Sequence, residues 1–185
     1  MRVYKPLSKH SFSYNEYQIV PIRDEDKYDI MKWRNEQIYH LRQSNPLDKK
    51  MQDNYFNNVI IKLFNQDEPN QILFSYLENG ICIGYGGLVH INWIDKNAEI
   101  SFVIKTELEK KHFKKHWDIY LNLIENVAFN ELKFNKIYTY AFDFRPKLYK
   151  ILESNNFSKE AILRNHIKVQ NNYFDIVIHS KFNNN

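Results

Sequence analysis

Glu99 and His90 are the two side chains whose type and setting best suit a general base. Glu99 lies between Ala98 and Ile100, so in an extended strand it points to the opposite face of the sheet from them. His90 lies in an otherwise apolar strand segment. A carboxylate or an imidazole can take the proton from an attacking nucleophile. The alternatives are a sheet-surface glutamate paired with Lys or Arg, and a hydrogen-bonded core histidine.

A second feature is basic and lies at the expected start of a long helix, from about His112 to Leu132. Four lysines gather there: Lys110, Lys111, Lys114 and Lys115. A helix N-terminus offers free N–H groups and a positive dipole end, which suit a phosphate group. Lysines oppose that dipole, so their position favours an anionic ligand, although they could simply line a solvated face. Thr106-x-x-Glu109 resembles a capping box, which would start the helix earlier and narrow a phosphate site.

Other reactive residue types carry weaker signals. His112 and His116 share a helix face, but a zinc site needs at least a third protein ligand, so we expect no metal. Cys82, the single cysteine, lies among apolar residues and is interpreted as an inert buried thiol. The segment Gly84–Gly87 lacks the spacing of a dinucleotide-binding motif. Small residues inside a strand instead indicate a bulge or a close ligand approach.

Hydrophobic periodicity and turn residues define the elements that must position these side chains. We expect, in order, a strand at 17–22, helices from Asp24 or Asp26 to Leu41 and from Asp48 to Leu63, strands at 71–77, 81–93 and 98–105, the long helix, a strand at 136–142, a helix at 146–153, and strands at 157–168 and 173–182. The order β-α-α-β-β-β-α-β-α-β-β predicts an α/β (α+β) domain with a mixed central sheet of about seven strands. We expect a single domain over residues 1–185, with 1–16 and 183–185 loosely ordered.

Composition narrows the functional classes. A chain of 185 residues, 43% hydrophobic and 26% charged, is typical of one globular domain. A net charge of +4 is too mild to indicate a nucleic-acid partner. No apolar run reaches the roughly 20 residues of a membrane helix, and the first residues lack a secretory signal. We therefore expect a cytoplasmic protein without a membrane or nucleic-acid partner.

Four local segments, taken in order, resemble the GNAT superfamily of acyl-CoA-dependent N-acyltransferases. They are Trp33-Arg34-Asn35, then Ala98–Ile104, then Val127–Leu132 leading into Lys136-Ile137-Tyr138, and finally Leu152–Ala161. The resemblance covers roughly residues 17–182. It is greatest to the branch that contains the ribosomal-protein acetyltransferases and the acetyltransferases of nucleotide-linked aminosugars of bacterial surface glycans.

The resemblance implies direct acetyl transfer from acetyl-CoA, as cosubstrate, to a primary amine, without a metal. The acceptor it favours is a nucleotide-linked aminosugar or a similar small metabolite. One alternative is a protein N-terminal acetyltransferase. Another, of a different class, is a catalytically degenerate acyl-CoA-binding protein. We expect a monomer or a homodimer.

The resemblance also assigns site residues. Backbone contact with the pantetheine arm falls on Phe102, Val103 and Ile104, and phosphate contact on Lys110, Lys111, His112, Phe113, Lys114, Lys115 and Arg145. The acceptor side comprises Trp33, Arg34, Tyr39, Arg42 and Tyr85. Glu99 and His90 are the candidate bases. The tyrosine that often protonates the leaving thiolate would fall on Leu152, so Tyr149, three residues earlier, takes that role. The family's two phosphate-loop glycines would fall on Lys110 and His112, which is a departure.

Overall fold

An eight-stranded sheet in the order β1-β2-β3-β4-β5-β6-β8-β7 organises the chain. The structure is a computed structural model that describes residues 2–183. The strands are β1 Phe12–Tyr14, β2 Tyr17–Pro21, β3 Ile72–Glu78, β4 Ile81–Asn92, β5 Asn97–Ile104, β6 Lys136–Phe142, β7 Ser158–Val169 and β8 Asn172–Phe182. Neighbouring strands are antiparallel except β5 and β6, which are parallel. The mixed α/β sheet expected from the element order is therefore present.

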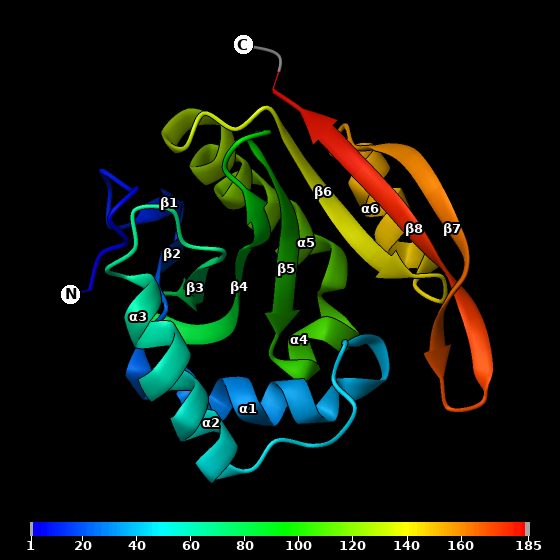
Figure 1. Ribbon diagram of the computed structural model, residues 1–185, viewed down its shortest axis with the longest axis horizontal. Coiled ribbons are helices and arrows are strands. Elements are labelled where there is room, and N and C mark those ends of the chain that lie inside the picture. Colours follow the sequence, from blue (N-terminus) through cyan, green and yellow to red (C-terminus); the bar gives the residue numbers. More distant parts are fainter. Residues whose placement is uncertain (1, 184–185) are drawn as a thin grey trace.

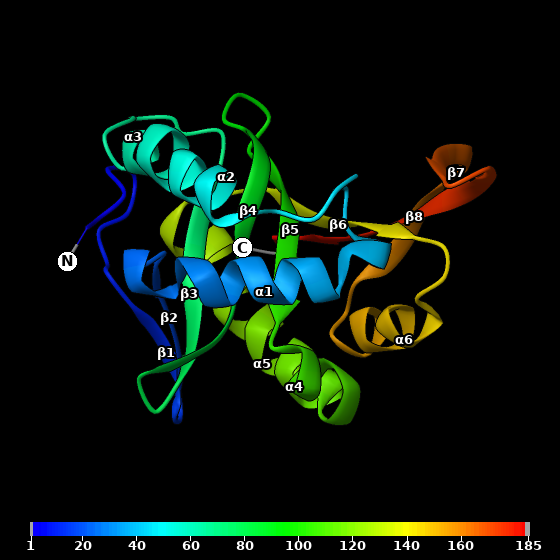
Figure 2. The same ribbon diagram turned by 90° about the horizontal axis from the view of Figure 1, so that it is seen from below.

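The helices cover both faces of this sheet. They are α1 Lys27–Glu36, α2 Lys49–Tyr55, α3 Ile61–Leu63, α4 Thr106–Lys111, α5 Phe113–Glu125 and α6 Pro146–Ser154. Helices α2 and α3 lie on one face, α5 and α6 on the other, and α1 passes across one end of β3, β4 and β5 (Figures 1 and 2). No helix within residues 2–183 is long and apolar enough to cross a membrane.

The core follows from the apolar stripe of α5, which packs against the central strands. The Tyr120 ring stacks on Phe102 of β5 with ring centres 3.8 Å apart, and Trp117 meets the same phenylalanine edge-on at 5.1 Å. Tyr76 of β3 adds a fourth ring, 5.8 Å from Tyr120. These large rings bury much apolar area each, so they fix how α5 sits on the sheet.

The N-terminal segment is a correction to the sequence prediction. We expected residues 1–16 to be loosely ordered, but Tyr4 is fully buried, stacked on Phe64 at 4.3 Å, with its hydroxyl donating to the Leu73 carbonyl at 3.0 Å. Strand β1 pairs with β2 and supplies the eighth strand. In the C-terminal tail, Asn183 N–H bonds to the Asn135 carbonyl at 2.8 Å, and residues 184–185 lie outside the described part.

The helix boundaries differ at two places that matter for the site. The first helix ends at Glu36, and a 3₁₀ turn covers Ile38–His40. The expected long helix is divided, because α4 precedes a break at His112 and α5 follows it. Thr106 does not cap α4, since its hydroxyl donates to the Glu36 carboxylate instead. After α5 a π-helical segment continues to Glu131.

Two irregularities in the sheet create the site. Strands β5 and β6 pair only from Asn97–Lys136 to Glu99–Tyr138, after which they diverge (Figure 1). In β4, the register with β5 shifts between Val89 and Asn92. The shift is a bulge, in which His90 adopts a left-handed conformation with φ of 50°.

The close approach of β4 and β5 gives a stability prediction at Gly86. A Cβ atom there would overlap the Ser101 carbonyl oxygen and the Tyr120 hydroxyl. Gly86→Ala should therefore lower the melting temperature by about 4–8 °C, the scale expected of overpacking in a domain this size. The measurement is thermal unfolding followed by circular dichroism. Gly80→Asn is the control, because Gly80 has a φ of 80° with nothing within 4 Å of the Cβ position, and asparagine tolerates that conformation. An unchanged melting temperature for Gly86→Ala would contradict this account.

Candidate active site

A pocket of about 410 Å³ occupies the gap between β5 and β6. Its lining comes from both faces of the sheet. The α1–α2 face contributes Arg34, Arg42, His90, Glu99, Ser101 and Tyr140, and the α5–α6 face contributes Phe102, Trp117, Thr139, Ala141 and Leu148. Consecutive strand residues point to opposite faces, so a pocket lined by both sets passes through the sheet. Such a passage lets two molecules meet from opposite sides.

Glu99 and His90 lie together on the α1–α2 face. The Glu99 side chain is 8% exposed and forms an ion pair with Arg42. His90 Nε2 lies 3.9 Å from Glu99 Oε2, and Arg42 Nη1 donates to His90 Nε2 at 3.4 Å. Glu99 is thus paired with an arginine, as the alternative interpretation had it, yet it lines the pocket. His90 is 62% exposed, so it is not a core histidine; the bulge turns it towards Glu99.

Arg34 connects this pocket to a second, more apolar one. Its Nη1 donates to the Tyr85 hydroxyl, and its Nε donates to Gln43 Oε1 at 2.9 Å. The second pocket, about 290 Å³ between α1, α2 and the sheet, shares Arg34 with the first and includes Tyr85 and Met51. Arg34 and Tyr85, both expected on the acceptor side, therefore meet where the two pockets join.

Two other residues expected on the acceptor side lie elsewhere. Trp33 is buried with 4% exposure and borders a separate polar groove that Lys32, Lys105 and Lys110 also line. Tyr39 is 57% exposed, with its ring against His40 at 4.8 Å. Neither residue is part of the pocket lining between β5 and β6, so the structure does not bring them to Glu99.

A chain of hydrogen bonds crosses the wide end of the gap. Arg145, just before α6, donates to Glu109 Oε1 of α4 at 2.6 Å and to His40 Nδ1 at 3.2 Å. His40 Nε2 donates to Gln37 Oε1 at 3.3 Å, and Gln37 Nε2 donates to the Ile104 carbonyl at 2.6 Å. Burial, and then the charge of Arg145, lower the pKa of His40 to about 3, so its ring is neutral and can accept from the arginine. The network ties the end of β5 to the start of α6.

The lysines do not converge as the sequence predicted. Lys114 bonds to Asp118 on its own helix at 2.6 Å, Lys115 lies over the Tyr17 ring at 5.2 Å, and Lys110 lines the separate groove. Lys111 is exposed, and the His112 N–H bonds to the Leu108 carbonyl at 2.8 Å. Side-chain charge at this helix start is therefore spread over several directions.

The first turn of α5 lies beside Arg145, which lines the pocket. The helical backbone hydrogen bonds of α5 begin with the His116 N–H, which bonds to the His112 carbonyl at 3.2 Å. The N–H groups of residues 113–115 therefore have no intrahelical partner. The Phe113 ring lies 5.3 Å from the Arg145 guanidinium carbon. Trp117, one turn later, lines the pocket. Phe102 also lines it, whereas Val103 and Ile104 are buried beside it without forming part of the lining.

Tyr149 is not among the residues that line the pocket. Its hydroxyl donates to Asp143 Oδ1 at 3.0 Å and to the Phe142 carbonyl at 3.3 Å, and its ring stacks on His179 at 5.1 Å. Burial raises the pKa of Tyr149 well above its ordinary value. Leu152, the aligned family position, is fully buried. Leu152 has no proton to donate, and the Tyr149 hydroxyl is engaged with Asp143 and the Phe142 carbonyl.

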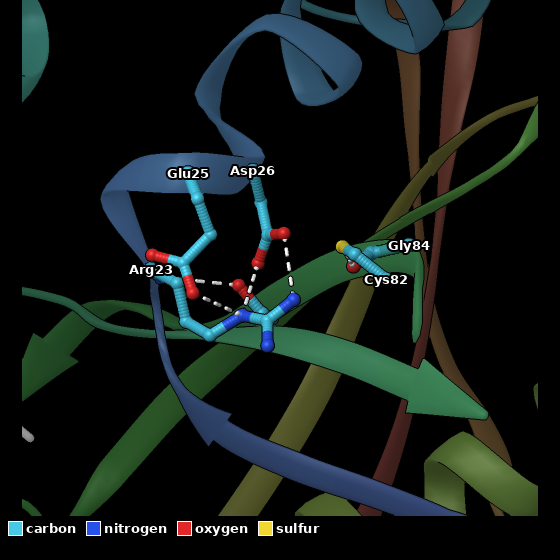
Figure 3. Close-up of polar contacts among 6 residues, drawn as sticks. Arg23, Glu25, Asp26, Cys82 and Gly84 are labelled. Carbon is cyan, nitrogen blue, oxygen red and sulfur yellow. Dashed lines mark hydrogen bonds and ion pairs between the residues drawn. The ribbon is translucent and has the colours of Figure 1, made fainter. Parts of the chain in front are cut away.

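Cys82 lies apart from this site, beside the Arg23–Asp26 ion pair that precedes α1 (Figure 3). Its thiol donates to the Gly84 carbonyl at 3.3 Å, and burial raises the pKa of the thiol to about 12. The protonated thiol is a poor nucleophile. His116 is buried with its Nδ1 3.1 Å from the Tyr76 hydroxyl, and residues 2–183 contain no group of three or more His, Cys, Asp or Glu side chains arranged for a metal ion.

Sequence reasoning did not identify three residues of the pocket and its network. Glu109 was visible only as part of a possible capping box, and its partner is Arg145. Gln37 follows the Trp-Arg-Asn segment, but nothing local links it to Ile104. Thr139 lies within an apolar strand, where a lone threonine gives no functional signal.

Comparisons with known proteins agree on the fold. Residues 19–178 match a family model described as an acetyltransferase (GNAT) domain. The spermidine N-acetyltransferase from Vibrio cholerae, solved with CoA and spermine, is 19% identical with a TM-score of 0.76, covering 92% of this chain and 97% of that one. The structure of a probable acetyltransferase is 21% identical with a TM-score of 0.77, covering 94% and 97%. At these identities the structural likeness shows the fold alone.

The neutral state of His40 gives a prediction for the pH dependence of stability. The pKa of His40 is lowered in the folded protein, so the unfolded chain binds its proton more readily. Stability should fall as the pH drops below about 6.5, by about 2 kcal/mol for this group between pH 7 and pH 5. Urea unfolding at pH 7, 6 and 5 measures it. His40→Gln should remove the loss of stability that is due to His40. The similar loss due to His116, whose pKa burial lowers to about 4, should remain. His10→Gln, at an exposed position, is the control. An identical pH dependence in His40→Gln and the unaltered protein would contradict the prediction.

Proposed function

The chain belongs to the GNAT acetyltransferase family, and we propose that it transfers the acetyl group of acetyl-CoA directly to a primary amine that also carries negative charge, such as a nucleotide-linked aminosugar. The observation that carries the proposal is the pocket between β5 and β6, which opens on both faces of the sheet. The donor and the acceptor can approach from opposite faces and meet beside Glu99. No covalent intermediate on the protein is needed for a transfer of this kind.

The residues at the wide end of the gap fit the donor. The free N–H groups in the first turn of α5 and the guanidinium of Arg145 suit a pyrophosphate. The edge of β5 beyond Glu99 has no strand partner, so its backbone can bond to the amide groups of an extended arm. These features replace the family's two phosphate-loop glycines, whose positions here are Lys110 and His112.

Glu99 and His90 serve the acceptor amine. The amine must lose a proton to attack the thioester carbonyl, and the Glu99 carboxylate receives that proton. His90 lies beside Glu99 and is exposed, so it can pass the proton on to solvent. Arg42 holds the Glu99 carboxylate in place by its ion pair. Acetyl-CoA supplies the activated acyl group, and the protein supplies orientation and the proton acceptor.

The charge of the pocket favours an anionic acceptor. On the acceptor side Arg34 and Arg42 contribute two positive charges to the lining, and Glu99, paired with Arg42, contributes one carboxylate. A polyamine would meet like charge there, which opposes binding. The Vibrio cholerae enzyme of similar fold is a spermidine acetyltransferase, so polyamines are the acceptor class to compare with. A protein N-terminus and binding without catalysis are the remaining alternatives.

The assignment of Glu99 predicts a separation of turnover from binding. Glu99→Gln should lower kcat by about 100-fold or more, the scale of general-base catalysis, and His90→Asn should lower it less. Acetyl-CoA at about 100 times its dissociation constant should still raise the melting temperature of both variants by roughly 5–11 °C, as in the unaltered protein. Steady-state kinetics and thermal unfolding with and without acetyl-CoA measure the two effects. Full turnover in both variants at pH 7 would exclude both bases, and stabilisation without turnover in the unaltered protein would favour the degenerate binding protein.

The acceptor class gives a second prediction. The unaltered protein should turn over a nucleotide-linked aminosugar with a higher kcat/KM than the free aminosugar or spermidine. Arg34→Gln should reduce kcat/KM for the nucleotide-linked sugar by roughly tenfold, the cost of one charge-assisted hydrogen bond, without the same loss for the free sugar. Arg164→Gln, an arginine paired with Asp175 on the β7–β8 hairpin, is the matched control. Faster turnover of spermidine, unaffected by Arg34→Gln, would overturn the anionic acceptor.

A further inference from the structure

Two buried side chains beside the pocket lack hydrogen-bond partners. Among the described residues, the buried side-chain polar atoms without a partner are Thr139 Oγ1 and both ring nitrogens of His179. Thr139 is 3% exposed and His179 is fully buried. They are opposite one another on β6 and β8, so they share a sheet face. Unpaired buried polar groups cost stability, so each calls for a reason to be there.

Thr139 lies at the narrow end of the gap. It directly follows Tyr138, the last β6 residue paired with β5, and it lines the pocket from the α5–α6 face. Glu99, the partner of Tyr138, lines the same end from the opposite face. The groups suited to phosphate, Arg145 and the first turn of α5, lie at the wide end. A donor held there by its phosphates would extend its reactive end towards Thr139.

We propose that the Thr139 hydroxyl donates a hydrogen bond to the sulfur of acyl-CoA and stabilises the thiolate as it leaves. The inference rests on the proposed function. In the step, a C–N bond forms, the C–S bond breaks with its electron pair remaining on sulfur, and the amine proton passes to Glu99. Tyr149, expected to assist the thiolate, instead bonds to Asp143. The thiolate therefore leaves with a hydrogen bond and without a proton from Tyr149.

His179 on β8 is the cross-strand neighbour of Thr139 on the same face of the sheet. Its ring is held by the stack on Tyr149, and its Nε2 lies 3.8 Å from Glu153 Oε1, beyond hydrogen-bond distance. Burial lowers the pKa of His179, so the ring is neutral at neutral pH. The imidazole and the Thr139 hydroxyl are cross-strand neighbours that are not hydrogen-bonded to each other. The neutral imidazole therefore places no fixed charge beside Thr139.

The first experiment separates a ligand-binding hydroxyl from a structural one. Thr139→Val keeps the side-chain shape and removes a hydroxyl that has no partner, so the free protein should melt at the same temperature or about 2–4 °C higher. Thr106→Val makes the same change at a hydroxyl bonded to Glu36 and Gln37, so it should melt lower. A fall in the melting temperature of Thr139→Val as large as that of Thr106→Val would show a structural role and overturn the inference.

The second experiment tests the contact with sulfur. Calorimetric titration at pH 9, where the thiolate form of CoA is more populated than at pH 7, compares CoA with desulfo-CoA. The unaltered protein should bind CoA about tenfold more tightly, and Thr139→Val should bind the two about equally. Both ligands meet the same titrating neighbours, His179, Tyr149, Asp143 and Glu153 on one face and Glu99 and His90 on the other, so the affinity ratio isolates the sulfur.

Each other result is decisive. An unchanged preference for CoA in Thr139→Val overturns the sulfur contact and leaves the proposed function intact. Equal weakening of both ligands places the hydroxyl on another part of the donor, which also overturns it. Failure of the unaltered protein to bind either ligand overturns the proposed function and this inference together.

Discussion

The pocket exists because β5 and β6 separate after the Glu99–Tyr138 pair. Each strand is paired along its outer edge, β5 with β4 from Gly84–Ile104 to Asn92–Asn97 and β6 with β8 over its whole length. Because those edges are occupied, neither strand can move across to close the gap without breaking a ladder. The network from Arg145 through His40 and Gln37 to the Ile104 carbonyl then fixes the width of the open end. A cavity of this kind is built into the sheet and needs no ligand to open it.

This gap explains why chemistry can occur in the middle of a sheet. Alternation along β5 sends Glu99 to one face and Phe102 to the other, and alternation along β6 does the same for Tyr140 and Thr139. In a fully paired sheet these sets would be separated by backbone. Where the pairing stops, the two faces share one pocket, so a carboxylate on one side and an aromatic wall on the other line a single cavity.

The sequence predicted what local pattern controls. The strand and helix order, the Asn79-Gly80 hairpin and the apolar stripe of α5 all follow from spacing along the chain. Residue type and the family resemblance predicted that Glu99, His90, Arg34 and Arg42 belong to the site, and all four line the pocket. The failures are long-range contacts. The burial of Tyr4 depends on Leu73 and Phe64, and the orientation of His90 depends on a bulge against β5. Nothing in the sequence close to Tyr4 or His90 indicates which distant residues they contact.

The break between α4 and α5 lies where the family resemblance places two glycines. In place of two glycines, α4 presents Glu109 to Arg145, with both side chains largely buried. Burial raises the pKa of Glu109, which means that the folded protein holds this carboxylate at an energetic cost that Arg145 offsets in part. Any phosphate that binds Arg145 must therefore compete with Glu109, because one guanidinium cannot give its best fork geometry to both. The backbone N–H groups at the start of α5 have no such competitor, so they are the contacts on which binding of an anion at this end has to depend.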